Sequence, residues 1–86
     1  MTKALAAEFA PRGIRVNGIA PGVMRTPMTV ESLSRDDVRE VLLRHIPMMR
    51  PGEPDELAGP AVFLASSLAS YVTGVMLPVD GGYLSV

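Results

Sequence analysis

The chain has 86 residues, a formal net charge of −1 and 48% hydrophobic residues, which is typical of one small globular domain. Its eight lysines and arginines are scattered, which argues against nucleic acid as the main partner, and no apolar run is long enough to span a membrane. The lack of cysteine excludes disulfides and thiolate chemistry, and one histidine without metal-ligand spacing gives no support for a metal site. No signal peptide is recognisable, so we expect a cytoplasmic protein.

The first two elements predicted are a helix and a buried strand. Residues 2–10 are rich in Ala, Leu, Lys and Glu, which favour a helix, and Pro11 ends it. Residues 14–20 form a short apolar run with β-branched residues, which predicts a strand. Arg15 and Asn17 interrupt this run, and polar groups inside a buried strand need partners. We expect the Asn17 side chain to bond to neighbouring backbone.

A sharp turn follows the strand. Pro21 fixes φ and lacks an N–H donor, while Gly22 lets the backbone bend or approach a ligand closely. Ligands of open α/β sheets bind just beyond the carboxyl ends of strands, so residues 23–28 are the predicted ligand segment. The residues alone are equally compatible with a strand, a tight turn and a loop that binds nothing.

The composition shifts over residues 29–51. Ser34-x-x-Asp37 is similar to a capping box and predicts a helix start, and Pro47 predicts its end. One apolar stripe of this helix is formed by Val38, Val41, Leu42 and Ile46. Four methionines lie near its ends: Met24, Met28, Met48 and Met49. Flexible thioethers suit a surface that fits varied apolar shapes, although methionine more often fills gaps in a core.

The remaining elements are a second helix and a second strand. Residues 53–65 begin with acids and a proline and continue with helical apolar periodicity, so we expect a largely buried helix. Pro60 within it conflicts with this expectation, because proline costs a hydrogen bond or kinks a helix. Residues 75–80 predict a strand, which Pro78 places at a sheet edge, and Gly81-Gly82 predicts a turn.

Five segments in this order and spacing resemble one known family. They are RVNGIAPGVMRTPM at 15–28, P-x-E-L-A at 54–58, FLAS at 63–66, YVTG at 71–74 and VDGG at 79–82. Together they resemble the C-terminal part of the short-chain dehydrogenase/reductase family. The resemblance implies an α/β fold, the C-terminal portion of a Rossmann-like doubly wound parallel sheet, ordered as helix, strand, lid helices, helix and edge strand. It implies one partial domain over residues 1–86, with a substrate lid at 24–51.

The resemblance also implies a binding role for the turn. Pro21 and Gly22 would lie beside the nicotinamide ring of NAD or NADP, and the Val23 backbone would bond to its carboxamide. The Thr26 hydroxyl would meet the carboxamide or the pyrophosphate, although a local bond or cap explains Thr26 equally plainly. The lid methionines Met24, Met28, Met48 and Met49 would face an apolar or bulky substrate.

The groups that do the chemistry in that family are missing from these residues. Neither Tyr71 nor Tyr83 has a lysine four residues later, and no glycine-rich loop opens a helix. No catalytic residue is therefore assigned. We expect a segment of an NAD(P)-dependent oxidoreductase acting on a small alcohol or carbonyl compound, inactive alone. The alternatives are a non-catalytic binding or assembly module and a decayed fragment.

Two consequences for folding and partners follow. A parallel strand normally has neighbours and is buried on both faces, so the first strand would keep an unpaired edge. We expect the chain alone to be marginally folded or to associate through that edge. A homo-oligomer, or association with a full-length relative, is the expected assembly.

Overall fold

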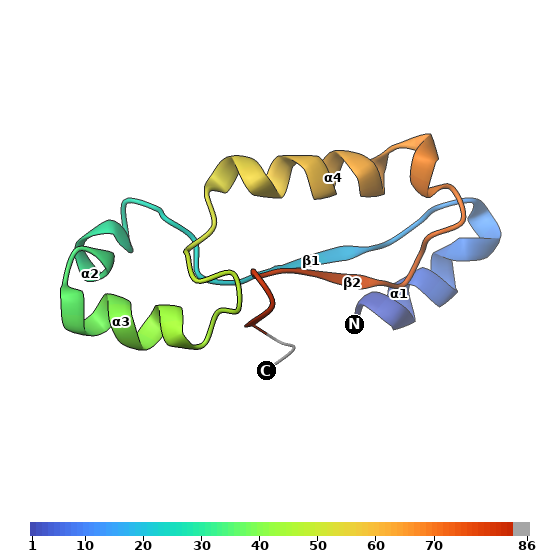
Figure 1. Cartoon of the computed structure of the whole chain (residues 1–86). Coiled ribbons are helices and arrows are strands. Elements are labelled where there is room, and N and C mark those ends of the chain that lie inside the picture. Colours follow the sequence, from blue (N-terminus) through green and yellow to red (C-terminus); the bar gives the residue numbers. More distant parts are fainter. Residues whose placement is uncertain (84–86) are drawn as a thin grey trace.

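The computed structural model describes residues 1–83 and alternates helices with strands (Figure 1). The helices are α1 (Thr2–Phe9), α2 (Val30–Leu33), α3 (Asp36–Arg44) and α4 (Ala58–Ala65), and the strands are β1 (Gly18–Pro21) and β2 (Met76–Val79). Short 3₁₀ turns cover Ala10–Arg12, Pro54–Leu57 and Ser67–Ala69. No helix within residues 1–83 is long and apolar enough to cross a membrane.

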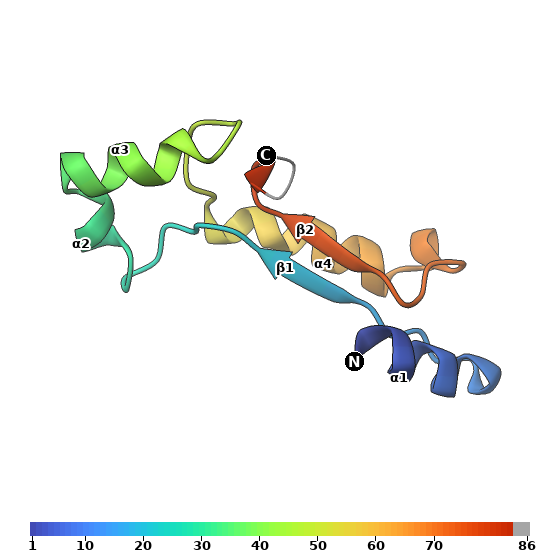
Figure 2. The same ribbon diagram turned by 90° about the horizontal axis from the view of Figure 1, so that it is seen from below.

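The two strands form a parallel sheet, with Gly18 opposite Met76 and Pro21 opposite Val79. Helix α4 runs along one face of this sheet, and α2 and α3 lie beyond the carboxyl end of β1 (Figures 1 and 2). Because the strands are parallel, both carboxyl ends meet at one edge. This arrangement confirms the predicted partial α/β fold with a parallel sheet.

Strand β1 is shorter than the predicted run of residues 14–20, because a side chain replaces the ladder at its start. The Asn17 side chain donates from Nδ2 to the Val72 carbonyl at 3.0 Å and accepts from the Val75 amide at 3.1 Å. These two bonds confirm the expectation that Asn17 bonds to neighbouring backbone. They hold the segment before β1 beside the segment before β2, and regular strand pairing begins at Gly18.

The capping box predicted at Ser34 is not formed, whereas the helix predicted after it is present as α3. Ser34 follows the short helix α2, and its hydroxyl donates to the Glu31 carbonyl at 2.6 Å. Helix α3 begins at Asp36 without a side-chain cap. The serine hydroxyl thus bonds to the turn before it, and no side-chain hydrogen bond caps the helix after it.

The conflict at Pro60 is resolved by a change of helix type. A 3₁₀ turn with a reciprocal capping box between Glu53 and Glu56 comes first, and α4 begins only at Ala58. Pro60 therefore falls in the first turn of α4, where an N–H would have no partner within that helix. Proline at this position therefore does not kink the helix.

The prediction that this helix is largely buried is wrong. In α4 only Leu64 is buried, while Val62 is 67% exposed and Phe63 is 41% exposed. A sheet of two strands is too narrow to cover more than a strip of the helix, so most of its apolar surface faces solvent.

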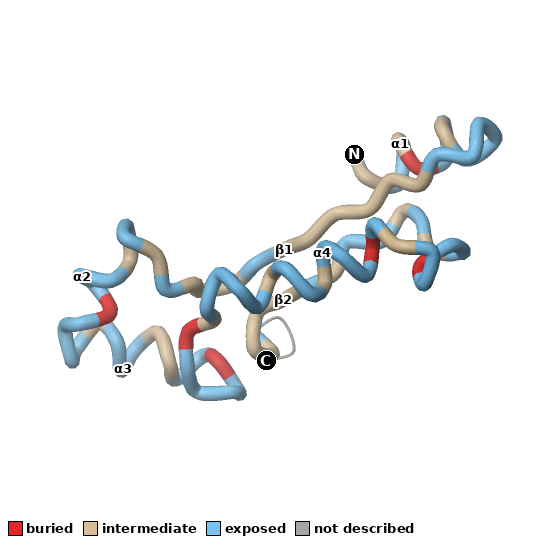
Figure 3. The backbone as a smooth tube through the Cα atoms, turned by 90° about the horizontal axis from the view of Figure 1, so that it is seen from above, coloured by how far each residue is buried: buried red, intermediate tan, exposed pale blue. Residues whose placement is uncertain are grey.

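The described chain is elongated and has no single core. Its extents are 50 × 23 × 20 Å and its radius of gyration is 15.7 Å, whereas a compact domain of this length would have about 12 Å. The buried residues are Ala6, Leu33, Ile46, Pro51, Leu64 and Ala69, and Figure 3 shows them spread along the chain. Such scattered burial supports the expectation of marginal stability.

Candidate functional site

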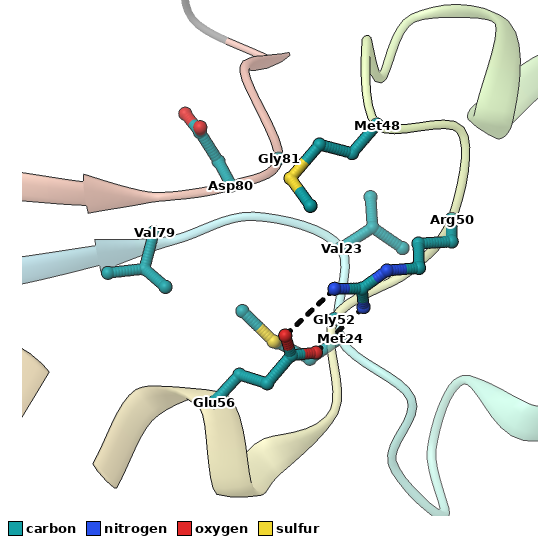
Figure 4. A pocket seen from close by; sticks show the side chains of 9 residues that line it. All are labelled: Val23, Met24, Met48, Arg50, Gly52, Glu56, Val79, Asp80 and Gly81. Atoms are coloured by element: carbon teal, nitrogen blue, oxygen red, sulfur yellow. Dashed lines mark hydrogen bonds and ion pairs between the residues drawn. The ribbon is translucent and has the colours of Figure 1, made fainter. Parts of the chain in front are cut away.

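Three segments meet at the carboxyl edge of the sheet. Residues 22–26 follow β1, residues 80–82 follow β2, and residues 48–52 lie between them (Figure 4). The Gly52 amide donates to the Val23 carbonyl at 2.8 Å, and the Arg25 amide donates to the Gly52 carbonyl at 2.8 Å. The Met48 amide donates to the Gly81 carbonyl at 3.0 Å. Backbone bonds thus fix the turn after β1 from one side.

Gly22 lets the two strand ends approach each other more closely than any other residue would. A Cβ at this position would lie 2.7 Å from the Asp80 Cβ and 2.9 Å from the Asp80 Cα. The predicted turn at residues 80–82 is also present, with Gly81 and Gly82 at positive φ and the Gly82 amide donating to the Asp80 carboxylate at 2.9 Å. The required glycine, Gly22, therefore lies directly before the predicted ligand segment.

A cavity of about 140 Å³ lies beneath this meeting point (Figure 4). Its charged wall is a bidentate pair in which the Arg50 guanidinium donates to both Glu56 carboxylate oxygens at 2.7 and 2.8 Å. That contact, with the Glu53 amide as second donor, lowers the pKa of Glu56 to about 2, and the carboxylate raises the pKa of Arg50. Sequence reasoning missed this pair, because six residues separate its members and no helical spacing signals it.

The four residues predicted to bind the coenzyme lie together along one turn. Pro21, Gly22 and Val23 line an open groove of about 310 Å³, and Gly22, Val23 and Thr26 line a second groove of about 480 Å³. Apolar side chains of α2 and α3, Leu33, Val38 and Leu42, form the opposite side of the second groove. The structure brings these residues together, and their role toward a coenzyme stays a prediction.

The polar groups of this turn fit a carboxamide. The Val23 carbonyl is bonded to Gly52, whereas the Val23 amide has no partner among the described residues. The Thr26 hydroxyl lies 3.2 Å from the Thr29 hydroxyl, and the Thr26 amide donates to that same Thr29 oxygen at 2.9 Å. The two residues that carry this donor and this hydroxyl line one groove, and an amide that offers C=O and NH₂ requires one group of each kind.

Sequence reasoning missed Thr29, although a threonine just before a helix is a signal for a side-chain hydrogen bond. The Arg25 guanidinium, one residue before Thr26, pairs with Glu53 at 2.9 Å, with both side chains about half exposed.

The four predicted lid methionines do not share one surface. Met24 and Met48 line the 140 Å³ cavity. Met28 is 92% exposed and Met49 is 73% exposed, and Met49 has a left-handed φ of 59°. The alternative that these residues fill core gaps is wrong for Met28, Met48 and Met49, which are all exposed. Within residues 1–83, no cluster of three or more His, Asp or Glu side chains could hold a metal ion.

Comparison with known proteins gives matches along almost the whole chain. A family model described as enoyl-(acyl carrier protein) reductase matches residues 1–84. Galactitol 2-dehydrogenase (L-tagatose-forming) of Cereibacter sphaeroides is 55% identical over 83 residues, which are 96% of this chain and 33% of that protein. The chain therefore spans about a third of the length of the curated relatives it matches.

Solved structures give the same result. A putative 2-deoxy-D-gluconate 3-dehydrogenase from Agrobacterium tumefaciens with bound NADP is 45% identical with a TM-score of 0.94, over 99% of this chain and 35% of that one. A 4-hydroxyisoleucine dehydrogenase complexed with NADH is 33% identical with a TM-score of 0.94, over the same shares. NAD(P) is thus the coenzyme of the family, and the fold is part of a Rossmann-like α/β fold. Sequence motifs, fold and relatives agree that this chain belongs to the short-chain dehydrogenase/reductase family.

Proposed function

We propose that residues 1–86 form the nicotinamide side and the substrate lid of an NAD(P)-dependent oxidoreductase that interconverts alcohol and carbonyl groups of a small molecule. The observation that carries this proposal is the turn after β1, where one groove is lined by Val23, whose amide has no partner within residues 1–83, and by Thr26, which carries a hydroxyl. One donor and one acceptor held rigidly would fix which face of a nicotinamide ring meets the substrate. The coenzyme, when bound, supplies the hydride acceptor or donor.

The chain's own residues bind and position in this proposal, and they transfer no proton. Neither tyrosine has a lysine four residues later, and no glycine-rich loop opens a helix in these 86 residues. A positioned acid or base is needed for carbonyl reduction at neutral pH. We therefore propose that the chain alone is inactive and that residues outside it supply the catalytic groups and the phosphate site.

The second part of the proposal is the substrate lid. Residues 24–51 contain α2 and α3, which form one side of the 480 Å³ groove through Leu33, Val38 and Leu42. A groove lined by these side chains favours a substrate with apolar or bulky parts. Met24 and Met48 border the neighbouring cavity and would adapt to its contents.

A second candidate is a non-catalytic binding or assembly module, which the exposed apolar surface favours. Val62 is 67% exposed and Leu68 is 81% exposed, and β1 pairs with β2 on one side only within residues 1–83. An apolar helix face beside an open strand edge promotes association. We predict association as a homo-oligomer or with a full-length relative, which light scattering tests. A cytoplasmic location is a separate prediction, which cell fractionation tests.

Titration calorimetry of the 86-residue chain with NAD, NADP and nicotinamide tests the first proposal. We expect no measurable binding of either dinucleotide in the micromolar range, because the phosphate site is missing. Nicotinamide at millimolar concentration should shift the NMR signals of the Gly22–Thr26 amides. Tight dinucleotide binding, or nicotinamide shifts confined to other residues, would contradict the proposal.

A further inference from the structure

Thr29 precedes α2 as its N-cap residue, yet its side chain does not cap the helix. A threonine at this position ordinarily accepts a hydrogen bond from an amide of the first turn. The Thr29 hydroxyl makes no such bond and turns back toward residues 24–26. The side chain thus bonds to the predicted ligand segment and does not cap the helix.

The bonds of Thr29 fix where its single hydroxyl proton lies. The Thr29 oxygen is 2.6 Å from the Met24 carbonyl, which can only accept, so the proton must lie between these two atoms. The Thr26 carbonyl, at a weaker 3.3 Å, can also only accept. Any orientation that pointed the proton at the Thr26 hydroxyl would leave two oxygens in close contact without a hydrogen between them.

The two lone pairs of the Thr29 oxygen are then both in use. One accepts from the Thr26 amide at 2.9 Å. The other faces the Thr26 hydroxyl at 3.2 Å, where Thr29 has no proton left to give, so only Thr26 can be the donor in this contact. The Thr26 hydroxyl proton is therefore committed to Thr29, and Thr26 offers only lone pairs to the groove that it lines.

We propose that Thr29 is a positioning residue that holds the Thr26 hydroxyl as a hydrogen-bond acceptor, so that the groove favours a neutral primary amide over a carboxylate or phosphate oxygen. The Val23 amide complements it as the donor for the amide carbonyl. A carboxylate would place a second acceptor against the Thr26 lone pairs and leave them unpaired. This inference rests on the proposed function for its ligand, while the Thr29 hydrogen bonds stand without it.

The first measurement needs no ligand. Hydrogen exchange of the Thr26 amide is compared in the full 86-residue chain and in the variants Thr29→Val, which removes the hydroxyl at constant shape, and Thr29→Ser, which keeps it. Loss of the bond should speed exchange about fivefold in Thr29→Val, with Thr29→Ser close to the parent. Ser34→Ala, which removes a hydroxyl bonded to Glu31 nearby, is the matched control and should change nothing at Thr26. Equal exchange in Thr29→Val and the parent would overturn the proposal.

The second measurement compares nicotinamide with nicotinate, which carries a carboxylate in place of the amide, by NMR shifts of the Gly22–Thr26 amides. The parent and Thr29→Ser should favour nicotinamide by about tenfold, and Thr29→Val should lose most of that preference. A merely structural role would weaken both ligands alike, and an unchanged ratio in Thr29→Val overturns the proposal. Absence of nicotinamide shifts in the parent would count against the proposed function, and the exchange comparison then decides the role of Thr29 alone.

Discussion

Replacing Gly22 with alanine tests whether the strand ends must approach as closely as the structure shows. The added Cβ would lie 2.7 Å from the Asp80 Cβ, which is 0.7 Å short of an ordinary contact of 3.4 Å, and 2.9 Å from the Asp80 backbone. Backbone cannot rotate away as a side chain can, so the ends of β1 and β2 must separate. The bond from the Gly22 amide to the Val79 carbonyl, at 3.1 Å, would lengthen with them.

The expected cost is about 1–3 kcal/mol, as for other insertions of a methyl group into a packed position. For a domain of this size each kcal/mol shifts Tm by roughly 4–8 °C, so Gly22→Ala should lower Tm by at least about 4 °C. Gly59→Ala is the matched control, because a Cβ at this position in α4 meets nothing within 4 Å. It should leave Tm unchanged or raise it, since alanine favours a helix by up to about 1 kcal/mol.

Circular dichroism melting of the three chains measures the difference. If the transition is too broad to give a Tm, exchange of the residue-22 amide gives the same comparison, with faster exchange expected only in Gly22→Ala. A Gly22→Ala chain as stable as the parent, with unchanged amide exchange, would refute the close approach of the strand ends. It would also remove the geometric reason for glycine directly before the predicted ligand segment.

Three further predictions concern stability and assembly. The pKa of Glu56 is lowered from its ordinary 4.5 to about 2, so its contribution to stability is present above pH 4.5 and is lost as the pH falls to about 2. The urea midpoint of the parent chain should fall over this pH range, and the urea midpoint of Glu56→Gln should not show this fall. Asn17→Ala should destabilise the chain by about 1 kcal/mol, because the Val75 amide loses its partner and the Val72 carbonyl keeps only the Arg15 guanidinium; an unchanged urea midpoint would contradict the bridging role of Asn17. Sedimentation of the chain should show association that grows with concentration, whereas a cooperative monomer that melts well above room temperature would argue against the open β1 edge.

The parts of the fold that the sequence predicts are those encoded by local chemistry. Gly81-Gly82 marks a turn because few residues tolerate its positive φ, and this turn is present. Pro21 ends β1, and Gly22 is required there by the close approach of Asp80. The bonds of Asn17 were predictable in kind, because an amide inside an apolar run needs backbone partners. Their identity was not predictable, since Val72 and Val75 are remote in sequence and come near only when the strands pair.

The errors arise where one side chain could serve two elements or where burial depends on the rest of the sheet. Ser34 has the type and spacing of a cap, yet its hydroxyl bonds backward to Glu31. Val62 follows helical apolar periodicity, yet it is 67% exposed, because the face it would pack on is not formed by these residues. In the site, Thr29 and the Arg50–Glu56 pair were missed because their partners are set by loop geometry.

In the proposed function, this chain lines the nicotinamide side of a cleft and lacks the groups that transfer a proton. A coenzyme-coupled assay of the purified 86-residue chain with NAD or NADP and a panel of polyols, followed by nicotinamide absorbance, tests this proposal. Thr26→Val serves as the control, since a contaminating dehydrogenase would be indifferent to that substitution. We predict no turnover above the protein-free rate in either chain. Alcohol oxidation by the parent that is lost in Thr26→Val would contradict the account.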